Sequence, residues 1–251
     1  MQLVPLLWRV IESFTHLFAV LRLRVLIRVS GDVPEGATLL CAKHASAFDI
    51  PVLGNVCRRL RGHIPYFQMG SFIGYRFLGP LAPLMRRLGG FSVMRPKEVL
   101  RLRRRRGWDR ARARARMEEI NAAAEATRRG VLRQEGTLIV FPEGTRDASR
   151  VRELVSELEV RTALELVSEG LEVRIWPAVL SYGRRRRLLR RPLVVDFLPS
   201  FSVAGNSPQE VLDRLAECFR SHWMGADEVE AVFSTHSGAR GLGRPVFLKT
   251  P

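Results

Sequence analysis

An apolar run that ends in a short polar loop and then in a helix start constrains the fold of this chain more than any other stretch. Residues 38–42, Thr-Leu-Leu-Cys-Ala, have the composition of a buried strand. Asp49, followed by an isoleucine and a proline, is typical of a helix start, because Asp caps helix N-termini and Pro is tolerated in the first turn. We therefore expect a helix from residue 49 to about residue 60, with His44 on the loop before it.

His44 and Asp49 stand at the two ends of this loop. On one continuous helix, side chains five residues apart would diverge by about 140°, whereas a loop can fold back and let the carboxylate meet the imidazole. A carboxylate that accepts from one ring nitrogen fixes the tautomer and leaves the other nitrogen free to act as a base. For a lone histidine, a capping or core role is the favoured interpretation, so the functional hypothesis depends on a second motif.

That motif follows another apolar run, residues 138–141, and contains an acid, a glycine, a hydroxyl and an arginine. Together the two stretches resemble the glycerolipid acyltransferase family, typified by the 1-acylglycerol-3-phosphate acyltransferases. His44 and Asp49 match the family's histidine–four residues–aspartate motif. Residues 141–146 match its Phe-Pro-Glu-Gly-Thr-Arg motif letter for letter.

Two further stretches support the resemblance. Residues 89–95 look like the family's middle motif, in which a glycine and an aromatic residue are followed by an arginine. Residues 175–179 look like its fourth motif, an apolar strand with a proline. The four motifs stand in the family's order, and the resemblance runs from about residue 38 to residue 200.

The resemblance implies an O-acyltransferase. It would move a fatty acyl group from a thioester, acyl-CoA or acyl-carrier protein, to the free hydroxyl of a lysophospholipid. The expected acceptor is 1-acylglycerol-3-phosphate, which would give phosphatidic acid. Neither a cofactor beyond the thioester co-substrate nor a covalent acyl-enzyme is implied, although Ser46 is a hydroxyl to examine near His44.

Site roles follow from the same resemblance. His44 would be the general base and Asp49 would orient and stabilise its ring, while backbone N–H groups near residue 144 or at the helix start are candidates for an oxyanion site. The phosphate would be held by two arginines, whose fork of donors suits an anion. The residues implied in substrate binding are Arg95, Glu143, Gly144, Thr145 and Arg146.

Strands that alternate with helices predict an α/β fold with a mostly parallel sheet flanked by helices. We expect short helices and loops over residues 62–88, where glycines and prolines recur, and an amphipathic helix over 151–170. The sequence after Arg146 lacks the family's usual continuation. This leaves open a lipid-binding protein of the same fold, or an acyltransferase whose acceptor is a phosphate-free lysolipid such as a lyso-aminolipid.

The domain organisation predicted is an N-terminal amphipathic helix over residues 1–30, an acyltransferase domain over 31–230 and a weakly ordered tail over 231–251. Arginines interrupt the N-terminal apolar stripe, so no uncharged stretch reaches the roughly 20 residues of a membrane span. The helix would lie in a membrane interface or cover the domain's own core. We expect a peripheral or monotopic protein at the cytoplasmic face of a membrane.

The net charge of +16, with 41 basic and 25 acidic residues, predicts partners that are polyanions. Arginines are densest over residues 101–116. Three interpretations of this run are open: it forms a solvated face, it attracts an anionic membrane, or it binds nucleic acid. We favour membrane over nucleic acid because Trp108 is the only aromatic residue in the run. The three cysteines and five histidines are scattered, so we predict a reducing compartment and no metal site.

Overall fold

A computed structural model describes residues 22–46, 48–70, 82–154, 157–185, 190–235 and 246–250. In this part of the chain nine strands form one sheet, in the order β4-β3-β5-β2-β6-β7-β1-β9, with β8 paired to β6. The strands are β1 Leu23–Ser30, β2 Ala37–Ala42, β3 Tyr66–Gly70, β4 Gly90–Val93, β5 Thr137–Val140, β6 Val173–Tyr182, β7 Arg191–Phe197, β8 Phe201–Ser202 and β9 Val246–Thr250. The helices are α2 Asp49–Arg61, α3 Ala82–Arg87, α4 Pro96–Arg106, α5 Arg110–Arg133, α6 Glu157–Ser168, α7 Pro208–His222 and α8 Ala226–Thr235.

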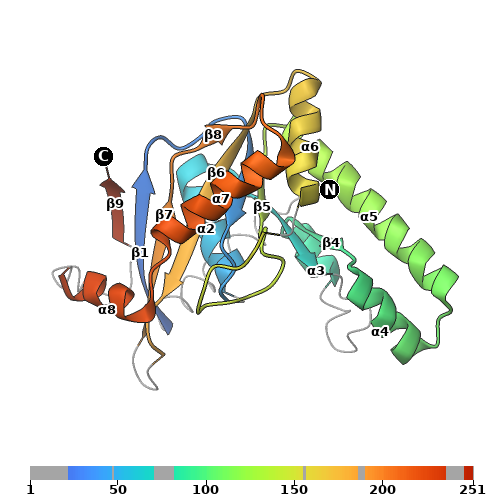
Figure 1. Ribbon diagram of the computed structural model, residues 1–251, viewed down its shortest axis with the longest axis horizontal. Helices are drawn as coiled ribbons and strands as arrows, with labels where there is room; N and C mark the ends of the chain where they lie inside the picture. Colours follow the sequence, from blue (N-terminus) through green and yellow to red (C-terminus); the bar gives the residue numbers. More distant parts are fainter. Residues whose placement is uncertain are drawn as a thin grey trace.

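The sheet is mostly parallel, as the alternating pattern predicts; only the pairs of β6 with β7 and with β8 are antiparallel. Strand β2 lies in the middle and is buried on both faces. Its Leu39 and Cys41 belong to a core with α5, α6 and α7, whereas Leu40 and Ala42 pack into a core with α2. Figure 1 shows α7 in front of the sheet and α2 behind it.

The predicted catalytic and binding motifs meet at one edge of the sheet. Strands β2, β3, β4, β5 and β6 run parallel to one another, so their carboxyl ends lie on the same side. His44 follows β2, Arg95 follows β4 and Glu143 follows β5. This topology brings motifs that are far apart in sequence to one place.

The helix predicted over residues 1–30 is wrong over residues 23–30, which form β1 between β7 and β9; residues 1–21 lie outside the described part. Val25, Ile27 and Val29 are β-branched and stand at alternate positions, which favours a strand. Several apolar residues of this stretch fit both the repeat of a helix and the repeat of a strand. Pairing with β7 and β9 selects the strand. No helix within the described ranges has the length and apolarity to cross a membrane.

Three other expectations differ from the structure. The tail predicted as weakly ordered includes the end of α8 and the strand β9, which adds to β1 in parallel. The stretch 62–88 contains the strand β3, whose alternating burial reflects one face packed on the core. The helix predicted over 151–170 begins only at Glu157 and ends at Ser168.

A bidentate ion pair fixes β1 to β7. Arg28 and Asp196 are register partners, and the Arg28 guanidinium donates to both oxygens of Asp196, which is only 3 % exposed. The hydrogen bond that Arg28 donates to Asp196 is the main reason that the pKa of Arg28 is raised, so the arginine stays charged.

We expect Arg28→Ala to lower the free energy of unfolding by about 2 kcal/mol, because it leaves the buried Asp196 carboxylate without its cation. The measurement is urea denaturation followed by circular dichroism. The control, Arg24→Ala, removes an exposed arginine of the same strand that lies over the Phe233 ring, and should cost less than about 1 kcal/mol. Equal effects of the two variants would contradict this role of the ion pair.

Candidate active site

The loop after β2 folds back on the Asp49 carboxylate. Oδ2 of Asp49 accepts three hydrogen bonds, from Nδ1 of His44 at 2.8 Å and from the backbone N–H groups of Ala45 at 2.7 Å and Ser46 at 2.8 Å. Asp49 is fully buried in the first turn of α2. It is not the helix cap that the sequence predicts: Phe48 occupies the cap position without a side-chain bond. The carboxylate closes the loop instead.

Tyr182 supplies the fourth donor and was not predicted from sequence. Its hydroxyl donates to Oδ1 of Asp49 at 2.7 Å from the carboxyl end of β6. Burial, and then the charge of Asp49, raise the pKa of the Tyr182 phenol above its usual value, so the group stays protonated. Only the position of β6 beside β2 could have indicated this contact, since 133 residues separate the two side chains.

The partners of the His44 ring define its tautomer. Nε of Arg146 lies 3.2 Å from Nε2 of His44, and a guanidinium can only donate. Nε2 is therefore the unprotonated nitrogen, and Nδ1 carries the proton that is donated to Asp49. The ring of Phe141 stacks on the imidazole with centroids 4.0 Å apart. His44 is 9 % exposed, so the base is almost completely buried.

Glu143 braces the histidine loop from the β5 side. Its Oε2 accepts from the backbone N–H of His44 at 2.9 Å, and its Oε1 accepts from the backbone N–H of Arg152 at 2.8 Å. The backbone N–H of Asp147 donates to the His44 carbonyl at 2.9 Å. Burial raises the pKa of Glu143, which is 3 % exposed. This glutamate thus connects the two motif loops.

A buried lysine holds the loop that carries Arg146. Lys43, fully buried, donates from Nζ to the carbonyl of Asp147 and lies 6.0 Å from the Trp223 ring centroid. Burial lowers the pKa of Lys43. The residue next to the base therefore fixes the chain that carries Arg146.

Arg95 and Arg146 reach the site from different strands. Arg95 precedes α4 and donates from Nη1 to the carbonyl of Gly144. The Gly144 N–H donates to the Phe141 carbonyl at 2.9 Å, so it is not an oxyanion donor in this structure. Further along the loop, no hydrogen bond from the backbone N–H groups of Thr145 and Arg146 is found within the described chain.

These groups line one cavity of about 790 Å³. Its charged and polar lining residues are His44, Gln68, Arg95, Glu98, Asn121, Arg128, Glu143, Thr145, Arg146 and Glu159. Among the described residues, no three histidine, cysteine or acidic side chains are grouped as a metal site would need. The arrangement can remove a proton at Nε2 and attract an anion to the two arginines.

Ser46 and Cys41 are the hydroxyl and the thiol nearest to His44 in sequence. The Ser46 hydroxyl accepts from the backbone N–H of Phe48 at 3.3 Å and is not bonded to His44 in the described chain. Cys41 is fully buried in β2, and burial raises the pKa of its thiol above the usual value. Neither side chain is placed as a nucleophile activated by His44.

Comparisons with known proteins concern the family and the fold. The family model described as Acyltransferase matches residues 24–181. The crystal structure of the 1-acyl-sn-glycerophosphate (LPA) acyltransferase PlsC from Thermotoga maritima is similar to this chain with a TM-score of 0.50 and 19 % identity, over 85 % of this chain and 80 % of that chain. At this identity the likeness concerns the fold. No curated protein matches the sequence.

We expect Tyr182→Phe to lower the free energy of unfolding by about 2 kcal/mol, because it leaves Oδ1 of the buried Asp49 without a donor. Urea denaturation measures the loss. The control is Tyr66→Phe, which removes a hydroxyl from a half-buried tyrosine of β3 and should have a clearly smaller effect. A Tyr182→Phe protein as stable as the parent would show that the hydroxyl does not hold the carboxylate.

Proposed function

This chain belongs to the acyltransferase family, as its resemblance to the glycerolipid acyltransferases predicts, and we propose that it transfers a fatty acyl group from a thioester to the free hydroxyl of a lysophospholipid. The donor is acyl-CoA or acyl-carrier protein. The acceptor proposed first is 1-acylglycerol-3-phosphate, which gives phosphatidic acid. One observation carries the proposal: Nδ1 of His44 is bonded to buried Asp49, its Nε2 is unprotonated, and His44 lines a cavity together with two arginines.

In the proposed mechanism, Nε2 of His44 takes the proton of the acceptor hydroxyl as its oxygen attacks the thioester carbonyl. General-base help of this kind contributes about 10²–10⁴-fold. Asp49 stabilises the imidazolium that forms. The tetrahedral intermediate then expels the thiolate, which receives the proton from the imidazolium. The two backbone N–H groups after Gly144 are the donors that we propose for the oxyanion.

Arg146 has two roles in this proposal. Its Nε donates a hydrogen bond to Nε2 of His44, so the base is blocked as long as this hydrogen bond is made. The phosphate of the acceptor is a stronger partner for a guanidinium than a neutral imidazole is. Phosphate binding at Arg146 and Arg95 therefore uncovers the base when the acceptor arrives.

We expect the purified protein to acylate 1-acylglycerol-3-phosphate, and His44→Ala to lower kcat by about 10²–10⁴-fold. The assay offers acyl-CoA and acyl-carrier protein as donors to a panel of lysolipids. The control is His222→Ala, which changes an exposed histidine on α7 and should retain full activity.

Other results of this assay decide between the alternatives. Transfer only to a phosphate-free lysolipid, such as a lyso-aminolipid, would keep the His44 mechanism and refute the phosphate role of the arginines. No transfer to any acceptor would favour a lipid-binding protein of the same fold. A His44→Ala protein as active as the parent would refute the mechanism.

We also propose that the protein associates peripherally with the cytoplasmic face of an anionic membrane. Arginines are exposed along α4 and at the start of α5, which extend to one side of the sheet in Figure 1. A surface of this kind attracts anionic headgroups. Nucleic acid is disfavoured because Trp108, the one aromatic residue of this run, has the Arg112 guanidinium 4.5 Å from its ring centroid.

Neutralising four exposed arginines of this region should weaken binding to anionic vesicles at least about tenfold. The variant is Arg103→Gln, Arg104→Gln, Arg106→Gln and Arg110→Gln combined, and the measurement is vesicle sedimentation with phosphatidylglycerol at low salt. The control carries Arg59→Gln, Arg133→Gln, Arg161→Gln and Arg220→Gln, which make the same charge change on exposed positions elsewhere. Equal loss in both variants would mean that net charge, not this surface, drives binding.

A further inference from the structure

The cavity that holds His44 also contains a buried carboxylate that pairs with no cation among the residues that the structure describes. Glu159, in the first turn of α6, is 4 % exposed and lines the cavity. Its Oε1 accepts a hydrogen bond from Nε2 of Gln68 at 2.5 Å. Its Oε2 is buried and has no hydrogen-bond partner within the described residues. One oxygen is therefore oriented by the protein and the other is left open.

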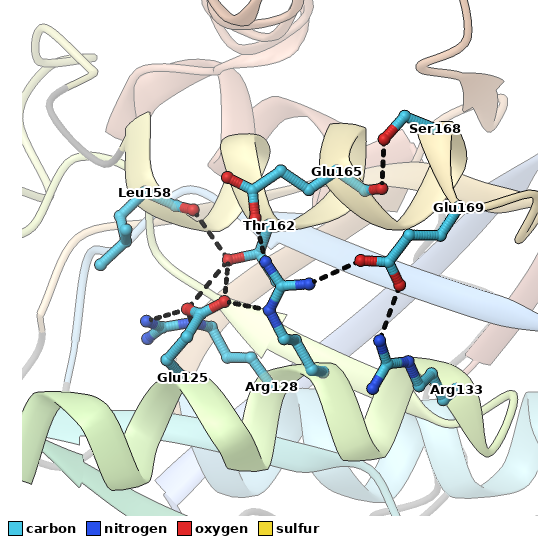
Figure 2. Close-up of polar contacts among 9 residues, drawn as sticks. Glu125, Arg128, Arg133, Leu158, Thr162, Glu165, Ser168 and Glu169 are labelled. Carbon is cyan, nitrogen blue, oxygen red and sulfur yellow. Dashed lines mark hydrogen bonds and ion pairs between the residues drawn. The ribbon is translucent and has the colours of Figure 1, made fainter.

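Arg128, a cationic residue that lines the same cavity, already has other partners. Arg128 is 1 % exposed, and its Nε and Nη2 donate to Glu125 at 3.0 and 2.6 Å, while its Nη1 donates to Oε1 of Gln68 at 3.0 Å. Figure 2 shows Glu125 on α5 in contact with Thr162 of α6, in a network that continues to Glu165 and Glu169. The charge of Arg128 is thus balanced by Glu125, and no ion pair reaches Glu159 in the described chain.

Burying a carboxylate is costly unless a charge and hydrogen bonds compensate for it. At Glu159 the protein supplies one neutral donor, Gln68, which Arg128 holds in place. The cavity thus offers cationic groups, Arg95 and Arg146, and a separate carboxylate for which the described part of the chain supplies no cation. A ligand that satisfies both carries an anion and a cation.

We propose that Glu159, positioned by Gln68, binds an ammonium group in the headgroup of the acceptor. This inference rests on the proposed acyl transfer and extends its acceptors beyond 1-acylglycerol-3-phosphate to lysolipids whose headgroup carries an ammonium group in addition to the anionic group held by Arg95 and Arg146. A neutral hydroxyl or amide would fill the hydrogen bond of Oε2 but would leave the charge of Glu159 unbalanced. An ammonium group donates a hydrogen bond to Oε2 and also balances the charge of Glu159.

The test compares an acceptor that carries this charge with a derivative that has lost it, and the Glu159→Gln variant separates the effect of the charge from that of the added acetyl group. Lysophosphatidylethanolamine should be acylated with a kcat/KM at least about tenfold higher than that of its N-acetyl derivative, which keeps the phosphate and loses the ammonium. Glu159→Gln keeps the shape of the side chain and should bring the two values together. Glu165→Gln, an exposed glutamate of the same helix, should leave the ratio as it is in the parent.

Three outcomes would overturn the proposal. The parent protein could fail to distinguish the two acceptors, or Glu159→Gln could keep their ratio. Lysophosphatidylglycerol, with hydroxyls in place of the ammonium, could match lysophosphatidylethanolamine and be affected equally by Glu159→Gln. That last result would assign Glu159 to a hydroxyl.

A binding measurement separates this inference from the proposed reaction. The His44→Ala protein should bind lysophosphatidylethanolamine more tightly than the N-acetyl derivative in isothermal titration with mixed micelles, and Glu159→Gln in that background should remove the difference. If no lysolipid is acylated but this difference persists, the reaction is wrong and the subsite stands. Equal binding of the two lipids would refute the subsite whatever the activity.

Discussion

The site depends on one buried charge, the carboxylate of Asp49. Four donors surround it: the imidazole of His44, two loop N–H groups and the hydroxyl of Tyr182. These contacts fold the loop after β2, fix the start of α2 against it and tie both to the end of β6. In a low-dielectric interior such a charge is tolerable only when its hydrogen bonds are made. The hydrogen bonds that buried Asp49 requires therefore fix the position of the His44 ring.

Much of the fold could be predicted because its signals are local. The apolar runs of β2 and β5 and the Ser-x-x-Glu cap of α7, where Ser207 and Glu210 bond reciprocally, are each contained in a few residues. Strand β1 could not be predicted in this way, since its basic and apolar residues also fit a helical stripe. Its partners, β7 and β9, lie near the other end of the chain.

The residues of the site also differ in whether a local sequence signal identifies them. His44, Asp49 and the loop from Glu143 to Arg146 lie in recognisable motifs, and the structure brings them together. Tyr182 and Glu159 lie in no motif: one ends a buried strand, and the other begins a helix in the stretch where the family's usual sequence is lost. Only the contacts across the sheet reveal what those two side chains face.

The pairing of β1 affects when this strand can fold. Arg28 meets Asp196 across 168 residues, and β9 completes the same side of the sheet near the last residue. During synthesis, β1 is made before β7 and β9 and stays without these two neighbours until both have left the ribosome. Contacts this far apart in sequence slow folding, because a long loop must close before they form. Until β7 and β9 are available, the edges of β1 lack partners, and unpaired strand edges make a partly folded chain prone to aggregation.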